Sequence, residues 1–184
     1  MTETIEEVQI LVDGNQIWYE GEITSRSICK LMFEISKIKG NLFVFVSSEG
    51  GSVTAGLAFY DFLNINSHRI VVIGFDRVCS AATYWLFSKC KTYAFANLKT
   101  LFHQIWHDFS DKSEALYSTI KSNEYHHEVI NSIFKTKNLD IDWQHKTHVF
   151  YADYLLANGI IDGFFDEKIL TVNNETIDAT PNSD

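Results

Sequence analysis

A buried strand that runs directly into a pair of glycines is the feature that most restricts what this chain can fold into. Residues 42–46 form an unbroken apolar, β-prone run, which is typical of a strand covered on both faces in a parallel sheet. Two glycines come soon after it, and residues 53–63 have helical spacing. Residues 70–75 then predict a second buried strand, and residues 80–88 predict a second, short helix. This alternation of strand and helix predicts an α/β fold with right-handed βαβ crossovers.

Shorter elements flank this pattern on both sides. The sequence predicts an N-terminal hairpin over residues 8–19 and an amphipathic helix over residues 24–39. Two short strands are predicted at residues 93–96 and 100–104. A long helix over residues 111–136 and a final helix over residues 151–158, which ends at Gly159, follow them. We expect one domain over residues 1–184, because the single proline, Pro181, lies near the end and no linker is evident. Residues 171–184 are expected to form a flexible tail.

Charge and cysteine usage exclude several classes of protein. A net charge of -9 disfavours binding to nucleic acid or to anionic lipid, because both depend on clustered Lys and Arg. No apolar run approaches the roughly 20 residues of a membrane-spanning helix, and the first residues are acidic where a secretory signal would be basic. We therefore expect a cytoplasmic protein. Cys29, Cys79 and Cys90 are odd in number and form no CxxC pair, so we interpret them as reduced, mostly buried thiols.

Three features, in order along the chain, are candidates for a catalytic role. The Gly50-Gly51 pair lies between a strand and a helix, where backbone N–H groups can approach a developing anion as in an oxyanion hole. Ser80 begins a short helix after the next strand, and His103 ends a later strand. Each feature alone has an ordinary alternative: a glycine-requiring turn, an N-cap serine, and a core histidine.

A metal site is the weaker interpretation of the histidines. His103 with His107 and His145 with His148 are close in sequence, and imidazole is a common metal ligand. However, a strand and a loop do not supply the helical i, i+4 pair of a zinc protease, and no Glu is placed as its base.

The glycine pair does not fit a phosphate-binding loop either, because such a loop needs a Lys after the glycines and none follows here. We expect neither a metal nor another cofactor.

Taken together, these segments resemble the proteolytic subunit of the Clp protease. The similar segments are SEGGSVTAG at 48–56 with Tyr60-Asp61, VCSAA at 78–82, Asn97 with LFHQ at 101–104, and Tyr151-Ala152 with NGIID at 158–162. The resemblance runs from about Ile17 to Leu170, and residues 1–16 form a divergent N-terminal segment.

The resemblance implies both a fold and an activity. The fold would be a crotonase-like, ClpP-like spiral of βαβ units with a long handle helix, the handle covering residues 105–137. The activity would be that of a serine-type endopeptidase, with Ser80 as nucleophile, His103 as general base, and the N–H groups of Gly51 and Ala81 as the oxyanion hole. The substrate would be peptides or unfolded protein, hydrolysed inside a homo-oligomeric chamber of stacked heptameric rings.

The chain departs from the family at positions that bear on activity. Thr147 falls where the family has its catalytic aspartate, and a shifted loop would be needed for Asp140 or Asp142 to replace it. Glu49 occupies a position where the family has a proline, and Asp76 occupies a position where the family has a glycine. Two rival functions therefore stay open: a catalytically weakened or inactive structural ring subunit, and a crotonase-type acyl-CoA enzyme. Whether an AAA+ unfoldase docks is also left open, because the family's axial loop is either absent or replaced by the hairpin expected from Val8 to Tyr19.

Overall fold

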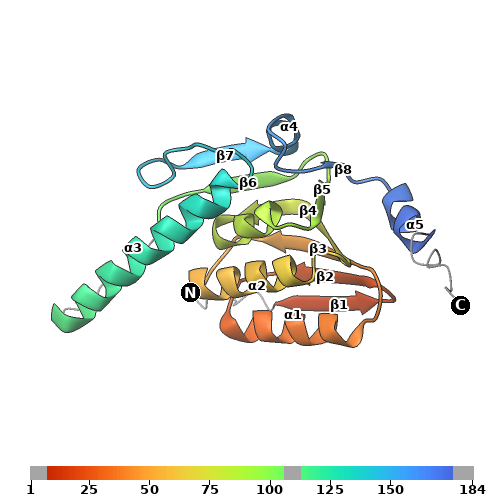
Figure 1. Cartoon of the computed structure of the whole chain (residues 1–184), viewed down its shortest axis with the longest axis horizontal. Helices are drawn as coiled ribbons and strands as arrows, with labels where there is room; N and C mark the ends of the chain where they lie inside the picture. The colour runs from red at the N-terminus through yellow and green to blue at the C-terminus, as the bar shows by residue number, and fades with distance from the viewer. Residues whose placement is uncertain (1–7, 106–112, 176–184) are drawn as a thin grey trace, which may run out of the picture.

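One mixed sheet organises the fold. The computed structural model describes residues 8–105 and 113–175, and within them eight strands join into this sheet (Figure 1). The strands are β1 (Gln9–Asp13), β2 (Gln16–Glu20), β3 (Leu42–Ser48), β4 (Ile70–Cys79), β5 (Lys91–Ala94), β6 (Lys99–Phe102), β7 (His148–Tyr151) and β8 (Gly163–Phe164). They run in the order β1-β2-β3-β4-β5-β8, while β6 pairs with β4 and β7 pairs with β6.

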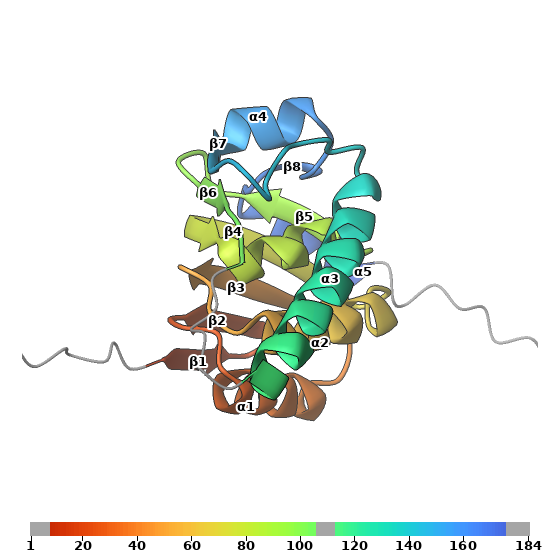
Figure 2. The same ribbon diagram turned by 90° about the vertical axis from the view of Figure 1, so that its left-hand side faces the viewer.

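Helices cover the sheet and extend beyond it. They are α1 (Ser25–Lys37), α2 (Val53–Ile65), the 3-10 helix η1 (Ser80–Phe87), α3 (Ser113–Lys135), α4 (Ala152–Ala157) and α5 (Lys168–Glu175). Helices α1 and α2 lie side by side along the sheet, α3 projects from the body, and α5 lies at the opposite end of the molecule from α3 (Figures 1 and 2). In the described part of the chain, no helix has the length and apolar character needed to cross a membrane.

The predicted hairpin and the βαβ order are confirmed. Strands β1 and β2 pair antiparallel around a two-residue turn, in which Gly14 has φ +58°. That backbone region favours glycine. Strands β2, β3, β4 and β5 then pair in parallel, each with the next. Thr24 caps α1 by accepting a hydrogen bond from the Ser27 N–H at 3.0 Å, so that helix begins where the sequence predicts.

Strand β3 is buried along its whole length, which explains its unbroken apolar sequence. All seven of its residues are buried. Val44 and Val46 belong to the large core on the side of α1 and α2, whereas Phe43 and Phe45 belong to a second core with Ile73 on the opposite face. The second core is capped by stacking of Trp18 on Phe45, with ring centroids 3.9 Å apart.

Strand β4 changes partner halfway along its length. Residues 71–74 pair with β5, and residues 77–79 pair with β6. Asp76 lies between the two pairings with φ +52°, an uncommon conformation for a residue other than glycine. The sequence predicts that this strand ends at Phe75, but the structure continues it to Cys79. The charged residues of this extension lie on the exposed end of the sheet, which is why they suggest a loop.

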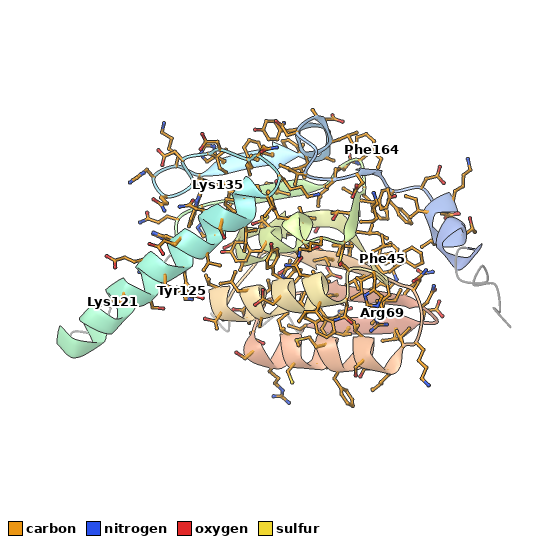
Figure 3. All side chains as sticks on the ribbon, in the orientation of Figure 1. Phe45, Arg69, Lys121, Tyr125, Lys135 and Phe164 are labelled. Carbon is orange, nitrogen blue, oxygen red and sulfur yellow. The ribbon has the colours of Figure 1, made fainter. Side chains whose placement is uncertain are left out.

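The C-terminal half of the long helix packs on the domain. Ile130, Ile133 and Phe134 are buried against the core, as their helical spacing predicts. Tyr125 is 63% exposed on the projecting part of α3, while Lys135 lies where the helix meets the body (Figure 3). The predicted start of this helix at Asp111, and residues 106–112 of the expected handle, lie outside the described residues.

The C-terminal region differs from the sequence-based expectation. The sequence does not predict the short strands β7 and β8, and the last helix that it predicts is α4, which begins at Ala152 and ends before Gly159 at φ +66°. Helix α5 runs to Glu175, so the tail expected over residues 171–184 begins inside a helix. Ile169 and Leu170 pack against the second core, and this burial accounts for a helix there. Residues 176–184 lie outside the described residues.

Candidate active site

The carboxyl ends of three parallel strands meet at one edge of the sheet. In the paired registers, Ser48 of β3 lies beside Val78 of β4, and Cys79 of β4 lies beside Leu101 of β6. The glycine pair, Ser80 and His103 come directly after these strand ends. Ligands of open α/β sheets bind at such an edge. The fold therefore brings the three predicted features to one place.

Glycine is required at both positions of the turn after β3. Gly50 has φ +105° and Gly51 has φ +137°. A Cβ atom on residue 50 would lie 2.6 Å from the Ser80 Cβ and 2.9 Å from the Cys79 carbonyl oxygen. A Cβ atom on residue 51 would collide with the Ile23 carbonyl oxygen. The turn backbone thus lies so close to Ser80 that no side chain fits between them.

Hydrogen bonds hold this turn on the side of β2 and α1. The Ser48 hydroxyl donates to the Gly21 carbonyl at 2.6 Å and accepts from the Gly50 N–H at 3.0 Å. The Ser52 N–H donates to the Ile23 carbonyl at 2.8 Å. The amides on either side of Gly51 are therefore engaged, and Gly51 itself contributes to the cavity wall between them.

Ser80 stands on a strained turn between β4 and η1. Its φ is +52°, which costs energy for any residue with a Cβ atom. The ordinary alternative of an N-cap serine is not what the structure has, because the N-cap position of η1 is Cys79 and no side chain caps the helix. Beyond Ser80, η1 is buried, and the Trp85 indole N–H donates to the Gly56 carbonyl at 3.0 Å. A rigid, buried helix thus presents a half-buried Ser80.

Ser80 and His103 line the same cavity, which has a volume of about 270 Å³. Its wall combines the turn after β3 with aromatic and aliphatic side chains from η1, β6 and α3. The lining residues are Glu49, Gly51, Val53, Ser80, Thr83, Tyr84, Phe102, His103, Ile105, Ile130, Phe134 and Trp143. The cavity thus places a hydroxyl and an imidazole beside an apolar recess.

The contact of the His103 ring determines which nitrogen can act as a base. Nδ1 lies 2.6 Å from the backbone carbonyl oxygen of Gln104. A carbonyl oxygen only accepts, so this contact favours the tautomer with the proton on Nδ1. Nε2 then carries the lone pair that could take a proton from a serine hydroxyl.

Thr147 directly precedes β7, and His103 directly follows β6. The antiparallel register of these strands ends at the pair of Phe102 and His148, and continuing it by one step would set Thr147 opposite His103. Opposite residues in such a pair have Cβ atoms about 5 Å apart. Thr147 is exposed and does not line the cavity. The role of Thr147 as a counterpart of the family's aspartate stays a prediction.

The candidate substitutes for that aspartate lie in the loop before β7. The Asp142 carboxylate accepts a hydrogen bond from His145 Nδ1 at 2.7 Å, and this contact lowers the Asp142 pKa. Asp140 is exposed and, like Asp142, does not line the cavity. The structure thus gives Asp142 a partner other than His103.

Within residues 8–105 and 113–175, no group of three or more His, Cys, Asp or Glu side chains could hold a metal ion. His107 falls outside those ranges. The three cysteines are free thiols, with Cys29 exposed and the other two buried. Burial raises the pKa of both Cys79 and Cys90 to about 11, which keeps these thiols protonated at neutral pH.

One residue of the site escapes prediction from the sequence. Arg77 donates from Nη1 to Glu49 Oε1 and from Nε to Asp76 Oδ2, the latter at 2.7 Å. In the sequence, the two carboxylates stand out only as departures from the family. Glu49 and Arg77 are far apart along the chain, so only the pairing of β3 with β4 brings them together.

Comparisons with known proteins agree with this geometry. A family model described as Clp protease matches residues 2–147, which is more than half of the 184-residue chain. ATP-dependent Clp protease proteolytic subunit 2 of Tropheryma whipplei (strain Twist) is 27% identical over 139 residues, covering 72% of this chain and 77% of that protein.

Two further relatives match over a shorter stretch. ATP-dependent Clp protease proteolytic subunit 1 of Leifsonia xyli subsp. xyli (strain CTCB07) is 28% identical over 101 residues, which is 51% of each chain. ATP-dependent Clp protease proteolytic subunit 2 of Bifidobacterium longum (strain NCC 2705) is 30% identical over 101 residues, covering 51% of this chain and 49% of that protein. The chain thus spans about half the length of these two relatives.

Proposed function

The chain belongs to the Clp protease family as a divergent ClpP-like peptidase subunit, and we propose that it hydrolyses peptide bonds with Ser80 as nucleophile and His103 as general base. One observation carries the proposal. Ser80 stands on a strained turn at the carboxyl end of β4, against the Gly50-Gly51 turn, and shares a cavity with His103. Neither the inactive ring subunit nor the crotonase-type acyl-CoA enzyme is favoured by these relatives, which are named as proteolytic subunits.

The first half of the reaction forms an acyl-enzyme. Ser80 Oγ attacks the carbonyl carbon of the scissile peptide bond while His103 Nε2 takes the hydroxyl proton. The carbonyl oxygen becomes an oxyanion, which accepts hydrogen bonds from the N–H groups of Gly51 and Ala81. When the intermediate collapses, the C–N bond breaks and His103 gives its proton to the leaving amine.

The second half reverses these roles with water. His103 Nε2 takes a proton from a water molecule that attacks the ester carbon, and the same two N–H groups hold the second oxyanion. Collapse of this intermediate breaks the ester bond, and the proton on His103 returns to Ser80 Oγ. The Gln104 carbonyl keeps the Nδ1 proton in place through both steps.

We propose that the third role is only weakly filled. Thr147 would lie opposite His103 in the continued register, and its hydroxyl could share the Nδ1–H of the imidazolium with the Gln104 carbonyl. A hydroxyl has no negative charge with which to stabilise the imidazolium, so turnover should be slow compared with enzymes that have a carboxylate. We propose small peptides or already unfolded protein as its substrates.

Assembly into stacked homo-oligomeric rings and a cytoplasmic location are part of the proposal. The projecting half of α3 supports assembly, because a helix that leaves its own domain offers a surface to a neighbouring subunit. Mass photometry at micromolar concentration tests this idea. A clean monomer would contradict it. Docking of an AAA+ unfoldase is a further question for the assembled ring.

Labelling with a serine-directed fluorophosphonate tests the function. The reagent phosphonylates an activated serine hydroxyl, and peptide mapping identifies the modified residue. We expect the label on Ser80, no label in Ser80→Ala, and normal labelling in Ser36→Ala, which removes an exposed hydroxyl on α1. Absence of the label from the wild type at neutral pH would favour the inactive ring subunit.

A further inference from the structure

Arg77 connects the turn after β3 with strand β4. Its guanidinium contacts Glu49, on the turn after β3, and Asp76, its own neighbour on β4. The two carboxylates raise the Arg77 pKa above its already high value, with the hydrogen bond to Glu49 as the largest cause. The Ser47 hydroxyl also lies 3.4 Å from Asp76 Oδ2. A three-residue ionic network thus spans the junction between β3 and β4.

The network lies next to the two backbone groups that the reaction needs. Glu49 immediately precedes Gly50-Gly51, and Arg77 lies three residues before Ser80. The hydrogen bonds of Ser48 and Ser52 hold the turn on the side of β2 and α1. The contact between Glu49 and Arg77 is a polar connection on the side of β4, where Ser80 lies.

The backbone of this turn makes such a connection useful. Glu49 is followed by two glycines, the residues with the most conformational freedom. An ion pair from the Glu49 side chain to Arg77 on β4 restrains the turn where its backbone is most permissive.

We propose that Arg77 is a positioning residue, which holds the Glu49–Gly51 turn against the end of β4 and so keeps the Gly51 N–H aligned with Ser80. The inference rests on the proposed function. Because Gly50 lies so close to Ser80, a small shift of the turn changes the distance from the Gly51 N–H to the developing oxyanion. Exposed ion pairs contribute little to global stability, so the effect should appear in the rate and not in the melting temperature.

The first test is a double-mutant cycle with Glu49→Gln, Arg77→Gln and the double variant. Each single variant should lower kcat and the rate of fluorophosphonate labelling about two- to fivefold with KM unchanged, which is the range expected of an exposed ion pair. The double variant should be no slower than either single variant. Raising the salt concentration should slow the wild type towards the variants, which themselves should not respond. Lys37→Gln removes a comparable exposed pair on α1 and serves as the control.

The second test needs no activity. Hydrogen exchange of the backbone amides at residues 49–53 should be faster in Arg77→Gln and Glu49→Gln than in the wild type, and unchanged in Lys37→Gln. This measurement separates the two hypotheses. A wild type whose Ser80 is not labelled refutes the proposed function, while the exchange rates still decide whether Arg77 restrains the turn.

Two results would overturn the inference. One is an unchanged exchange rate of the turn in Arg77→Gln. The other is a change of KM for cationic peptides in opposite directions in Glu49→Gln and Arg77→Gln, because it would mean that the Glu49 carboxylate acts on the substrate and Arg77 merely neutralises it.

Discussion

The side of the site that holds Ser80, the proposed nucleophile, and the side that holds His103, the proposed base, are built from different kinds of structure. Gly50, Gly51 and Ser80 lie at the ends of long, buried strands, and their positions are set by backbone contacts and positive φ angles. His103 and Thr147 flank the four-residue strands β6 and β7, and Thr147 is exposed. Backbone geometry tolerates little sequence change, whereas a side chain at a strand end is easily replaced. We therefore expect the divergence of this chain to affect proton transfer more than oxyanion binding.

The largest effect on activity is expected when the proposed nucleophile is removed. Ser80→Ala should reduce peptide hydrolysis to background, because the equivalent loss in an efficient serine protease is about 10⁶-fold. Folding should be unaffected, since the half-buried hydroxyl contributes little to packing. Turnover of a fluorogenic peptide and the melting temperature check this prediction. Activity equal to that of the wild type would remove Ser80 from the mechanism.

The second prediction tests the backbone basis of the nucleophile side. In Gly50→Ala the new Cβ would meet Ser80, so the turn must move and the rate of fluorophosphonate labelling should fall about 10²- to 10³-fold, as when an oxyanion donor is lost. The control is Gly40→Ala, where φ is +79° and a Cβ meets nothing within 4 Å. It carries a similar backbone penalty without the collision. Equal labelling by both variants would mean that strain, and not contact, limits the site.

The third prediction addresses the base side. Thr147→Asp should place a carboxylate opposite His103 and raise kcat at least about tenfold, because the corresponding change from carboxylate to amide costs about 10⁴-fold in a serine protease. Thr147→Asn is the matched uncharged control and should not raise kcat. Steady-state hydrolysis at pH 7 measures both. If neither variant exceeds the wild type, another group supports the imidazolium.

The smallest expected effect concerns the loop that leads to Thr147. Asp142 is exposed and its folded pKa is lowered by the hydrogen bond from His145, so the carboxylate contributes stability above its unfolded pKa of about 3.9 and loses it as the pH falls further. Asp142→Asn should therefore shift the urea midpoint slightly at pH 7 and by less at pH 3. Equal shifts at both pH values would point to a cause other than charge.

The sequence places Ser80 and the glycine pair at one edge of the sheet for a physical reason. A long apolar run such as residues 42–46 favours a buried strand, and the residues directly after such a strand lie at the edge of a parallel sheet. Ser80 and the glycine pair are therefore located from the pattern alone. The resemblance to the family then supplies the roles of these residues.

The missed parts depend on contacts between residues far apart in the chain. Strand β7 is short and half exposed, and β8 has two residues, so neither has a hydrophobic pattern to detect. Helix α5 is set by packing of Ile169 and Leu170 on the second core. The pair of Glu49 and Arg77 needs the register of β3 and β4, which sequence periodicity does not provide.

The change of partner along β4 also determines how heat should inactivate the protein. Strands β6 and β7 are attached to the rest of the sheet through residues 77–79 of β4, while β3 pairs with β4 over a much longer stretch. Short pairings open locally before the whole domain unfolds. Detachment of β6 would carry His103 away from Ser80 and leave β1 to β5 folded. Catalysis should then disappear on heating while circular dichroism still reports an intact sheet, and cooling before global unfolding should restore it.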